Sequence, residues 1–149
     1  MAGVAVKGVD KLLAKLSDME KRDVAGTAVK RACLIVEHEA KKNCPHGDGF
    51  LKSSITHSTT LNGDIAVGTV ATNEEYAAYV EFGTGLYAEK GDGRKDVPWV
   101  YRDAAGNFYT TAGQHPQPFL RPALENSKEK IKSVFRRAIR DKVKEVCND

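Results

Sequence analysis

The stretch "LKSSITHSTTLNGDIAVGTVAT", residues 51–72, decides the expected fold. It is rich in β-branched and hydroxyl side chains, and β-branched residues favour extended strands. Near its middle stands Asn62-Gly63. Between two strand-like runs, this dipeptide is the strongest short-range signal for a β-hairpin. We therefore predict two antiparallel strands joined at this pair.

Helical patterns lie on both sides of the hairpin. Before it, apolar residues recur at helical spacing in residues 9–19 and again from about residue 22 to residue 43. After it, a short helix is expected in "NEEYAAYVEF", residues 73–82, and a long one from about residue 120 to residue 146. This order predicts an α+β fold, with an antiparallel sheet covered by the long N-terminal and C-terminal helices.

The composition is that of a soluble globular protein. The 149 residues, 41% hydrophobic and 29% charged, suit a single domain spanning residues 1–149. No apolar run is long enough to cross a membrane. The start, "MAGVAVKGVD", lacks the apolar core of a secretory signal, so we expect the chain to be made in a cytoplasm. The three scattered cysteines indicate reduced thiols.

The short helix runs directly into "EFGTG", residues 81–85. A phosphate-binding loop would need a lysine followed by Ser or Thr at a fixed spacing, and a dinucleotide fingerprint would need a third glycine before a helix. Neither is present, so Gly83 and Gly85 are better interpreted as a backbone exit that requires positive φ. The pair begins a glycine-rich stretch that ends near Gly113.

No residue pattern predicts catalysis or a cofactor. The segment with His38, Cys44, His46 and Asp48 lacks the ligand spacing of a zinc site. His57 stands among serines and threonines, but on a strand these are alternating exposed positions. Glu74-Glu75 fit a helix start better than an acid–base pair. We expect no enzyme, no metal, no cofactor and no small-molecule substrate.

Aromatic residues concentrate in the second half of the chain. Nine of the eleven lie between Tyr76 and Phe119. Within this region "VPWVYRD" and "NFYTT" flank "AAG", which predicts a second hairpin. We call residues 86–115 the arm. Its aromatics could anchor a subunit interface or cap the domain's own sheet, and chemistry alone does not choose between these two interpretations.

The last helix is basic. Residues 126–149 carry eight Lys or Arg against four acidic residues. Such a helix can contact nucleic acid, a membrane or an acidic partner, but more often it presents a solvated face. The main alternative function is therefore a small nucleic-acid-associated or toxin-like protein that uses this helix.

Several motifs resemble the HK97 gp10-like family of tailed bacteriophages. These are "EEYAAYVEFGTG", then "PWVYRDAAGNFYTTAGQHPQPFLRPAL", and upstream "CPHGDGFLKSSI", which is similar to the family's Pro-x-x-Thr-Gly-x-Leu-(Lys/Arg)-x-Ser-Ile stretch. Asp48 stands where threonine is usual, and Asp can make a similar local turn bond. "GVDKLLAKL" is similar to the family's opening helix.

The resemblance implies a structural protein of the virion, made in the bacterial host, without catalytic residues. It further implies a ring at the head–tail junction, in contact with connector, adaptor or tail-terminator proteins. DNA contact stays open. On this interpretation the arm leaves the domain at a hinge and returns at "QPFLRPA". The expected hinge residues are Phe82, Gly83, Thr84, Gly85, Pro118 and Phe119, and the expected interface residues are Trp99, Tyr101, Phe108 and Tyr109.

Overall fold

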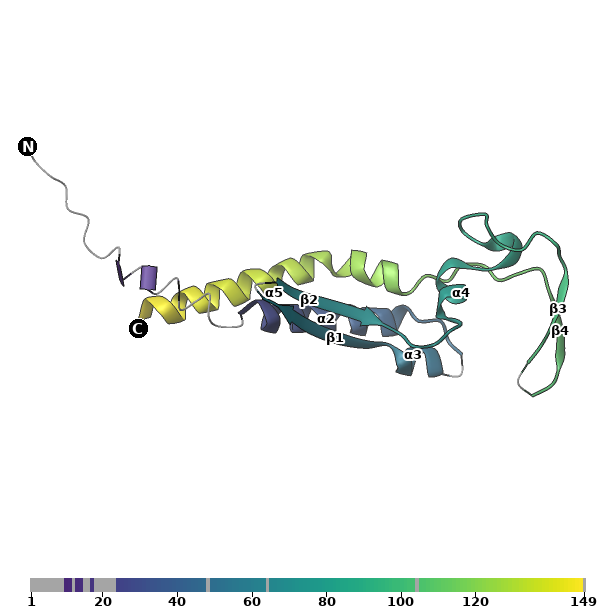
Figure 1. Cartoon of the computed structure of the whole chain (residues 1–149), viewed down its shortest axis with the longest axis horizontal. Helices are drawn as coiled ribbons and strands as arrows, with labels where there is room; N and C mark the ends of the chain where they lie inside the picture. The colour runs from purple at the N-terminus through teal and green to yellow at the C-terminus, as the bar shows by residue number, and fades with distance from the viewer. Residues whose placement is uncertain are drawn as a thin grey trace, which may run out of the picture.

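The structure is a computed structural model. It describes residues 10, 11, 13, 14 and 17, and residues 24–148 except Asp48, Asp64 and Ala104. Most of the helix expected over residues 9–19 lies outside the described residues, although the five described ones are helical. Figure 1 shows an elongated molecule with a helix-and-hairpin body at one end and a second hairpin at the other.

The fold is α+β, as predicted. The body contains α2 (Val24–Asn43), α3 (Phe50–Ser54), β1 (Thr56–Asn62), β2 (Ile65–Ala71) and α5 (Leu120–Asn148). A second group of elements follows α4 (Ala77–Phe82) and comprises a 3-10 turn (Gly85–Tyr87), β3 (Trp99–Arg102) and β4 (Phe108–Thr111). In the described residues the strands form two separate antiparallel pairs, β1–β2 and β3–β4.

The predicted Asn62-Gly63 hairpin is confirmed. Asn62 pairs with Ile65 at the turn and Thr56 pairs with Ala71 at the far end. Gly63 has a φ of 59°, a conformation that glycine adopts at little cost in such turns. The second predicted hairpin is also confirmed, with Tyr101 opposite Tyr109.

The first strand is shorter than the sequence pattern indicated. We expected extended structure from residue 51, but residues 50–54 form α3 and β1 begins at Thr56. Leu51 and Ile55 are both buried in the core. Residues four apart share a face in a helix and in a strand alike. A helical turn, however, separates them by only about 6 Å along the chain axis, whereas a strand would separate them by about 13 Å, so the helix gathers both side chains into one small core. The hydroxyl groups of Ser53 and Ser54 each donate to a carbonyl three residues earlier.

Helix α2 is the centre of the body. It packs against both strands of the first hairpin and against α5. The two helices lie side by side and run in opposite directions (Figure 1). The buried core draws on α2, on α3 and its end, on α4 and on the start of α5; its members are Val36, Ala40, Cys44, Leu51, Ile55, Ala77, Val80, Phe119 and Ala123.

Gly68 sets the spacing between β2 and α2. A Cβ atom at this position would lie 2.3 Å from Cys33 Sγ and 2.7 Å from Val29 Cγ1. Both distances are shorter than real carbon contacts, so only a residue without a side chain allows the strand to approach the helix this closely. The hairpin covers α2 because of this contact.

We predict that Gly68→Ala lowers the free energy of unfolding by about 1–3 kcal/mol, the usual cost of overpacking a core. Urea denaturation measures the change. Adding Cys33→Ala removes the nearest atom, so Gly68→Ala should cost less in that background. An equal cost in both backgrounds would contradict the proposed clash.

Candidate assembly surface

The two ends of the arm are held together by hydrogen bonds. Thr84 N–H donates to Gln114 O at 2.9 Å, and Gln114 N–H donates back to Thr84 Oγ1 at 2.9 Å. Leu86 N–H donates to Ala112 O at 3.0 Å. The residues where the arm leaves and returns therefore pair with each other, and the arm starts from a defined base.

The glycines at this base confirm the expected positive φ. Gly83 has a φ of 75° and Gly85 a φ of 59°. A Cβ atom on Gly85 would lie 2.3 Å from Ala112 O and 2.7 Å from the Trp99 ring. Gly85 therefore meets two requirements, a left-handed backbone and a close approach of the returning chain.

The carboxylate of Glu81 joins α4 to the start of α5. Its side chain is buried, with 3% of the residue exposed. One oxygen accepts hydrogen bonds from the backbone N–H groups of Phe119, at 2.8 Å, and Leu120, at 3.0 Å. The other accepts from the Arg121 N–H at 3.1 Å and from Arg121 Nε at 2.9 Å. Glu81 thus caps the first turn of a helix that begins some forty residues later.

Arg121 extends this contact to the beginning of the arm. Its guanidinium binds both oxygens of Glu89, at 3.0 and 2.6 Å, in a two-pronged arrangement. It also lies over the Phe82 ring, 4.9 Å from the ring centre. The two carboxylates raise the pKa of Arg121. Hydrogen bonds from Arg121 in turn lower the pKa of Glu89.

The pKa of Glu81 reflects two opposing effects. Burial acts to raise it, but the hydrogen bonds from the N–H groups of Leu120 and Phe119 and from Arg121 favour the charged form. The net pKa lies below the ordinary value of 4.5. The carboxylate is therefore charged at neutral pH, and its negative charge faces the positive end of the α5 dipole.

The expected hinge residues lie together at the base, but they differ in burial. Phe119 is fully buried in the core, whereas 40% of Phe82 is exposed. Next to Pro118, Gln117 N–H donates to Val80 O at 2.7 Å. Phe119 is thus an anchor of the returning chain. Motion about this base is not tested and stays a prediction.

The expected interface residues lie on the β3–β4 hairpin. Phe108 is 72% exposed, Tyr101 48% and Tyr109 47%. The two tyrosine rings stack across the strands with centres 5.5 Å apart. Trp99 differs because its ring, half-buried, lies against Gly85 at the base and under the Arg94 guanidinium. Their role in assembly remains a prediction.

A cleft of about 720 Å³ lies between α4 and the arm. Its walls carry aromatic side chains from both, including Tyr76, Tyr79, Trp99 and Tyr101. Arg94 and Asp92 supply charges at the same place. The aromatic surface therefore extends from the hairpin into a hollow at its base.

Comparison with known proteins now gives the family. The model of the HK97 gp10-like family, described as "Bacteriophage HK97-gp10, putative tail-component", matches residues 9–83. The chain belongs to this family. No curated protein and no solved structure matches it. As an HK97 gp10-like protein it is a structural protein related to phage tails, and its family is not a known enzyme family.

The matched segment of the HK97 gp10-like chain ends at Gly83, where the base of the arm begins. It includes α2, the first hairpin, α4 and Glu81. The arm and α5 lie beyond it. The resemblance that we noted in the arm and in "QPFLRPAL" therefore rests on those motifs alone.

Among the residues that the structure describes, which exclude Asp48, the other candidates of the HK97 gp10-like chain do not come together as a chemical site. His57 Nδ1 on β1 forms a hydrogen bond with the carboxylate of Glu37 on α2, and Lys41 binds the same carboxylate. The Lys41 and His57 hydrogen bonds lower the pKa of Glu37. Cys44 is buried in the core. Among the residues described, no three His, Cys, Asp or Glu side chains could hold a metal ion, and no helix has the length and hydropathy to span a membrane.

We predict that Glu81→Gln lowers the free energy of unfolding by about 3 kcal/mol at pH 7, since it removes the charge that three backbone N–H groups and Arg121 face. The folded pKa of Glu81 is lowered, so its contribution is present above pH 4.5 and is lost as the pH falls through the folded pKa. The free energies of unfolding of the wild type and the variant should therefore become similar at acidic pH.

Urea unfolding between pH 7 and pH 3 measures this difference. Glu75→Gln is the matched control, because Glu75 is an exposed carboxylate just before α4, the helix that contains Glu81. It should leave stability nearly unchanged. A Glu81→Gln effect as small as that of the control, or one that does not shrink in acid, would contradict the assignment.

Proposed function

We propose that this protein acts at the head–tail junction of a tailed phage by assembling into a ring of identical subunits. Its partners there would be connector or adaptor proteins and tail-terminator proteins. The proposal rests on the family and on one observation, the exposed aromatic hairpin at the end of the molecule, beyond the body (Figure 1). We further propose that residues 1–149 form one domain, from which residues 86–115 protrude.

The exposed surface of the hairpin supports contact with another protein. Val100 and Phe108, 61% and 72% exposed, lie on the face opposite to Tyr101 and Tyr109. Apolar side chains are therefore exposed on both faces of a two-stranded sheet. A hairpin of two strands is only marginally stable in water alone, so packing on a neighbour would both cover and stabilise it.

The base of the arm suits this role. The Thr84–Gln114 pairing and the Glu81–Arg121–Glu89 contacts fix where the arm leaves the body. A neighbour then binds a surface whose origin is already ordered, which reduces the entropy lost on assembly. If each arm binds the next subunit in the same way, the contact is head-to-tail, and such contacts generate a ring when the rotation between subunits closes.

The first body hairpin adds a second surface for contact between subunits. β2 contains neither a charged residue nor a proline, and His57 is the one titratable residue of β1. Proteins usually protect exposed strand edges with charged side chains or prolines. In addition, 65% of Ile65 and 46% of Val67 are exposed. These uncharged edges are compatible with strand pairing between neighbouring subunits.

We predict that Tyr101→Ala with Phe108→Ala weakens assembly and leaves the monomer folded. Each aromatic at an interface core commonly contributes about 2 kcal/mol, so the concentration at half-assembly should rise by about 100-fold or more. Mass measurement over a concentration series and negative-stain imaging follow the ring. Trp99 is kept intact because its ring packs against Gly85 of the same chain.

Phe50→Ala is the matched control for this pair. Phe50 is 65% exposed but lies on α3, in the body. It should assemble like the wild type. If the double variant melts much earlier as a monomer and assembles normally once folded, the aromatics belong to the core and the arm is not the interface.

A deletion tests the arm as a separate unit. Thr84 and Gln114 are hydrogen-bonded neighbours, so a two-residue Asn-Gly turn can replace residues 85–113. We predict that this variant unfolds cooperatively near the wild-type temperature but no longer forms rings. Thermal unfolding measures whether the body still folds, and mass measurement shows whether rings still form. An unfolded product would show that the arm belongs to the folding unit, and persisting rings would show that assembly does not need it.

A further inference from the structure

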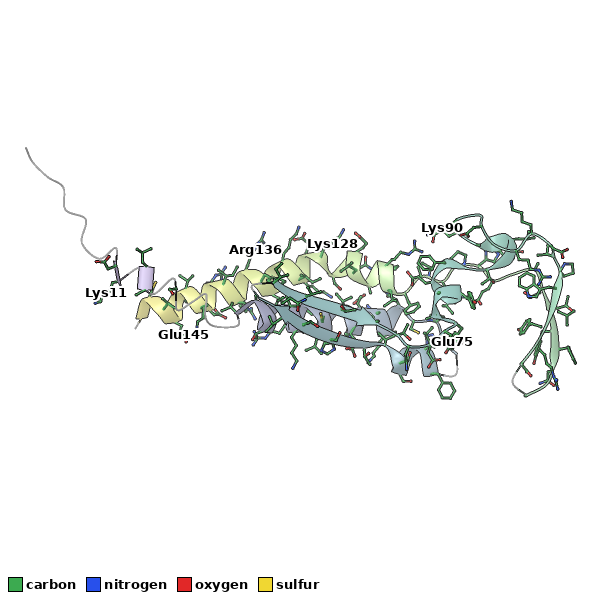
Figure 2. The ribbon with its side chains drawn as sticks, in the orientation of Figure 1. Lys11, Glu75, Lys90, Lys128, Arg136 and Glu145 are labelled. Atoms are coloured by element: carbon green, nitrogen blue, oxygen red, sulfur yellow. The ribbon has the colours of Figure 1, made fainter. Side chains whose placement is uncertain are left out.

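The C-terminal half of α5 carries a row of basic side chains on one side. Arg136, Arg140 and Lys144 follow at steps of four residues, so they lie one turn apart on the same face. Arg137 lies beside them, and all four are exposed. In Figure 2 the Arg136 side chain points away from α2 and the first hairpin. We call these four residues the basic stripe.

The four basic side chains of the stripe outnumber the acidic side chains beside them, Asp141 and Glu145. Three other lysines of α5 each pair with a glutamate three residues away; these are Lys128, Lys132 and Lys142. No residue of the stripe makes such an ion pair within the described part of the chain. Glu129 attracts Arg136 only at longer range. Within the described part of α5, the four residues of the stripe and Lys130 therefore lack an ion-pair partner, whereas Lys128, Lys132 and Lys142 have one.

Helix stability does not account for this arrangement. Like charges four residues apart repel each other, and Arg136, Arg140 and Lys144 form two such pairs in succession. The helix dipole favours cations in the last turn, which includes Lys144. The three arginines lie two to three turns before the end of α5 at Asn148, where the dipole has little effect. A polyanion placed along the stripe would relieve the repulsion.

We propose that the basic stripe binds duplex DNA through its phosphates. This inference rests on the proposed position at the head–tail junction, where the phage genome must pass. Three of the four side chains are arginines, whose planar guanidinium binds phosphate with two hydrogen bonds. From Arg136 to Lys144 the helix rises about 12 Å, the length of three to four phosphates along one strand.

The expected binding does not depend on base sequence. Sequence readout would require side chains in a groove, and single-strand binding would require aromatic side chains on which bases stack. The stripe contains neither an aromatic nor an amide side chain. A single subunit should therefore bind weakly and with strong salt dependence, and a ring should bind more tightly because several stripes act together.

The experiment uses the full chain and a fluorescent 30-base-pair duplex of arbitrary sequence. Fluorescence anisotropy is measured between 50 and 200 mM NaCl. Replacing all four stripe residues by glutamine should lower affinity at least tenfold. It should also reduce the magnitude of the slope of log K against log salt by about 3.6, since each of the four lost phosphate contacts changes it by about 0.9.

A matched variant removes the same charge elsewhere. Lys30, Arg31, Lys42 and Lys52 are exposed and lie in the body, outside α5 and outside the arm. Their replacement by glutamine should leave affinity within about threefold of the wild type. An equal loss in both variants would overturn the proposal, as would no binding by the wild type at 50 mM salt. Vesicles of phosphatidylserine serve as the alternative polyanionic surface, and stronger binding to them than to DNA would also overturn it.

Ring formation is measured separately on the same stripe variant by mass. Rings that form but do not bind DNA would refute this inference and leave the proposed assembly standing. DNA binding by wild-type protein that stays monomeric at all concentrations would support the stripe and refute the ring. The two proposals therefore fail by different measurements.

Discussion

The buried carboxylate of Glu81 holds the architecture together. It lies at the end of α4, and it binds the backbone N–H groups that open α5, 38 to 40 residues later. Every residue of the arm lies between these two points. The same carboxylate therefore starts the longest helix, closes the arm and positions Arg121 for its contact with Glu89. Without it the first turn of α5 would have buried, unpaired donors, because Phe119 next to it is fully buried.

This contact also separates two kinds of structure. On one side lies a body whose core combines α2, α3, α4 and the start of α5. On the other lies a hairpin that exposes its aromatics on both faces. Closing a loop of this length costs conformational entropy, and the body contributes the contacts that offset it. The base of the arm is therefore already ordered before a neighbouring subunit binds. Less conformational entropy is lost on assembly, and more of the interaction free energy appears as affinity.

Local signals explain which elements could be predicted from the sequence. The Asn62-Gly63 pair, the apolar stripe of α2 and the long stripe of α5 each act over a few residues, and each predicted element is present. The short α3 was missed because the spacing of Leu51 and Ile55, four residues, fits the periodicity of a helix as well as that of a strand. Tertiary burial of both residues selected the helix.

Glu81 was missed for a different reason. Its partners lie far along the chain, and no local pattern joins "VEFG" to "PFLRP". One signal was nevertheless available. Phe119 precedes α5, and phenylalanine has no side-chain oxygen to cap a helix, so the first N–H groups needed an acceptor from elsewhere. A glutamate at the end of a short apolar helix, next to the residues where the chain returns, is such an acceptor.

The exposed aromatics and the basic stripe occupy opposite ends of the molecule. The arm follows α4, next to the start of α5, whereas the stripe lies in the last turns of α5 at the other end of the body (Figure 1). Since α5 has 29 residues, about 43 Å of helix separates its two ends. A contact at one end therefore does not cover the other. Within one subunit, a partner bound to the arm therefore leaves the stripe exposed.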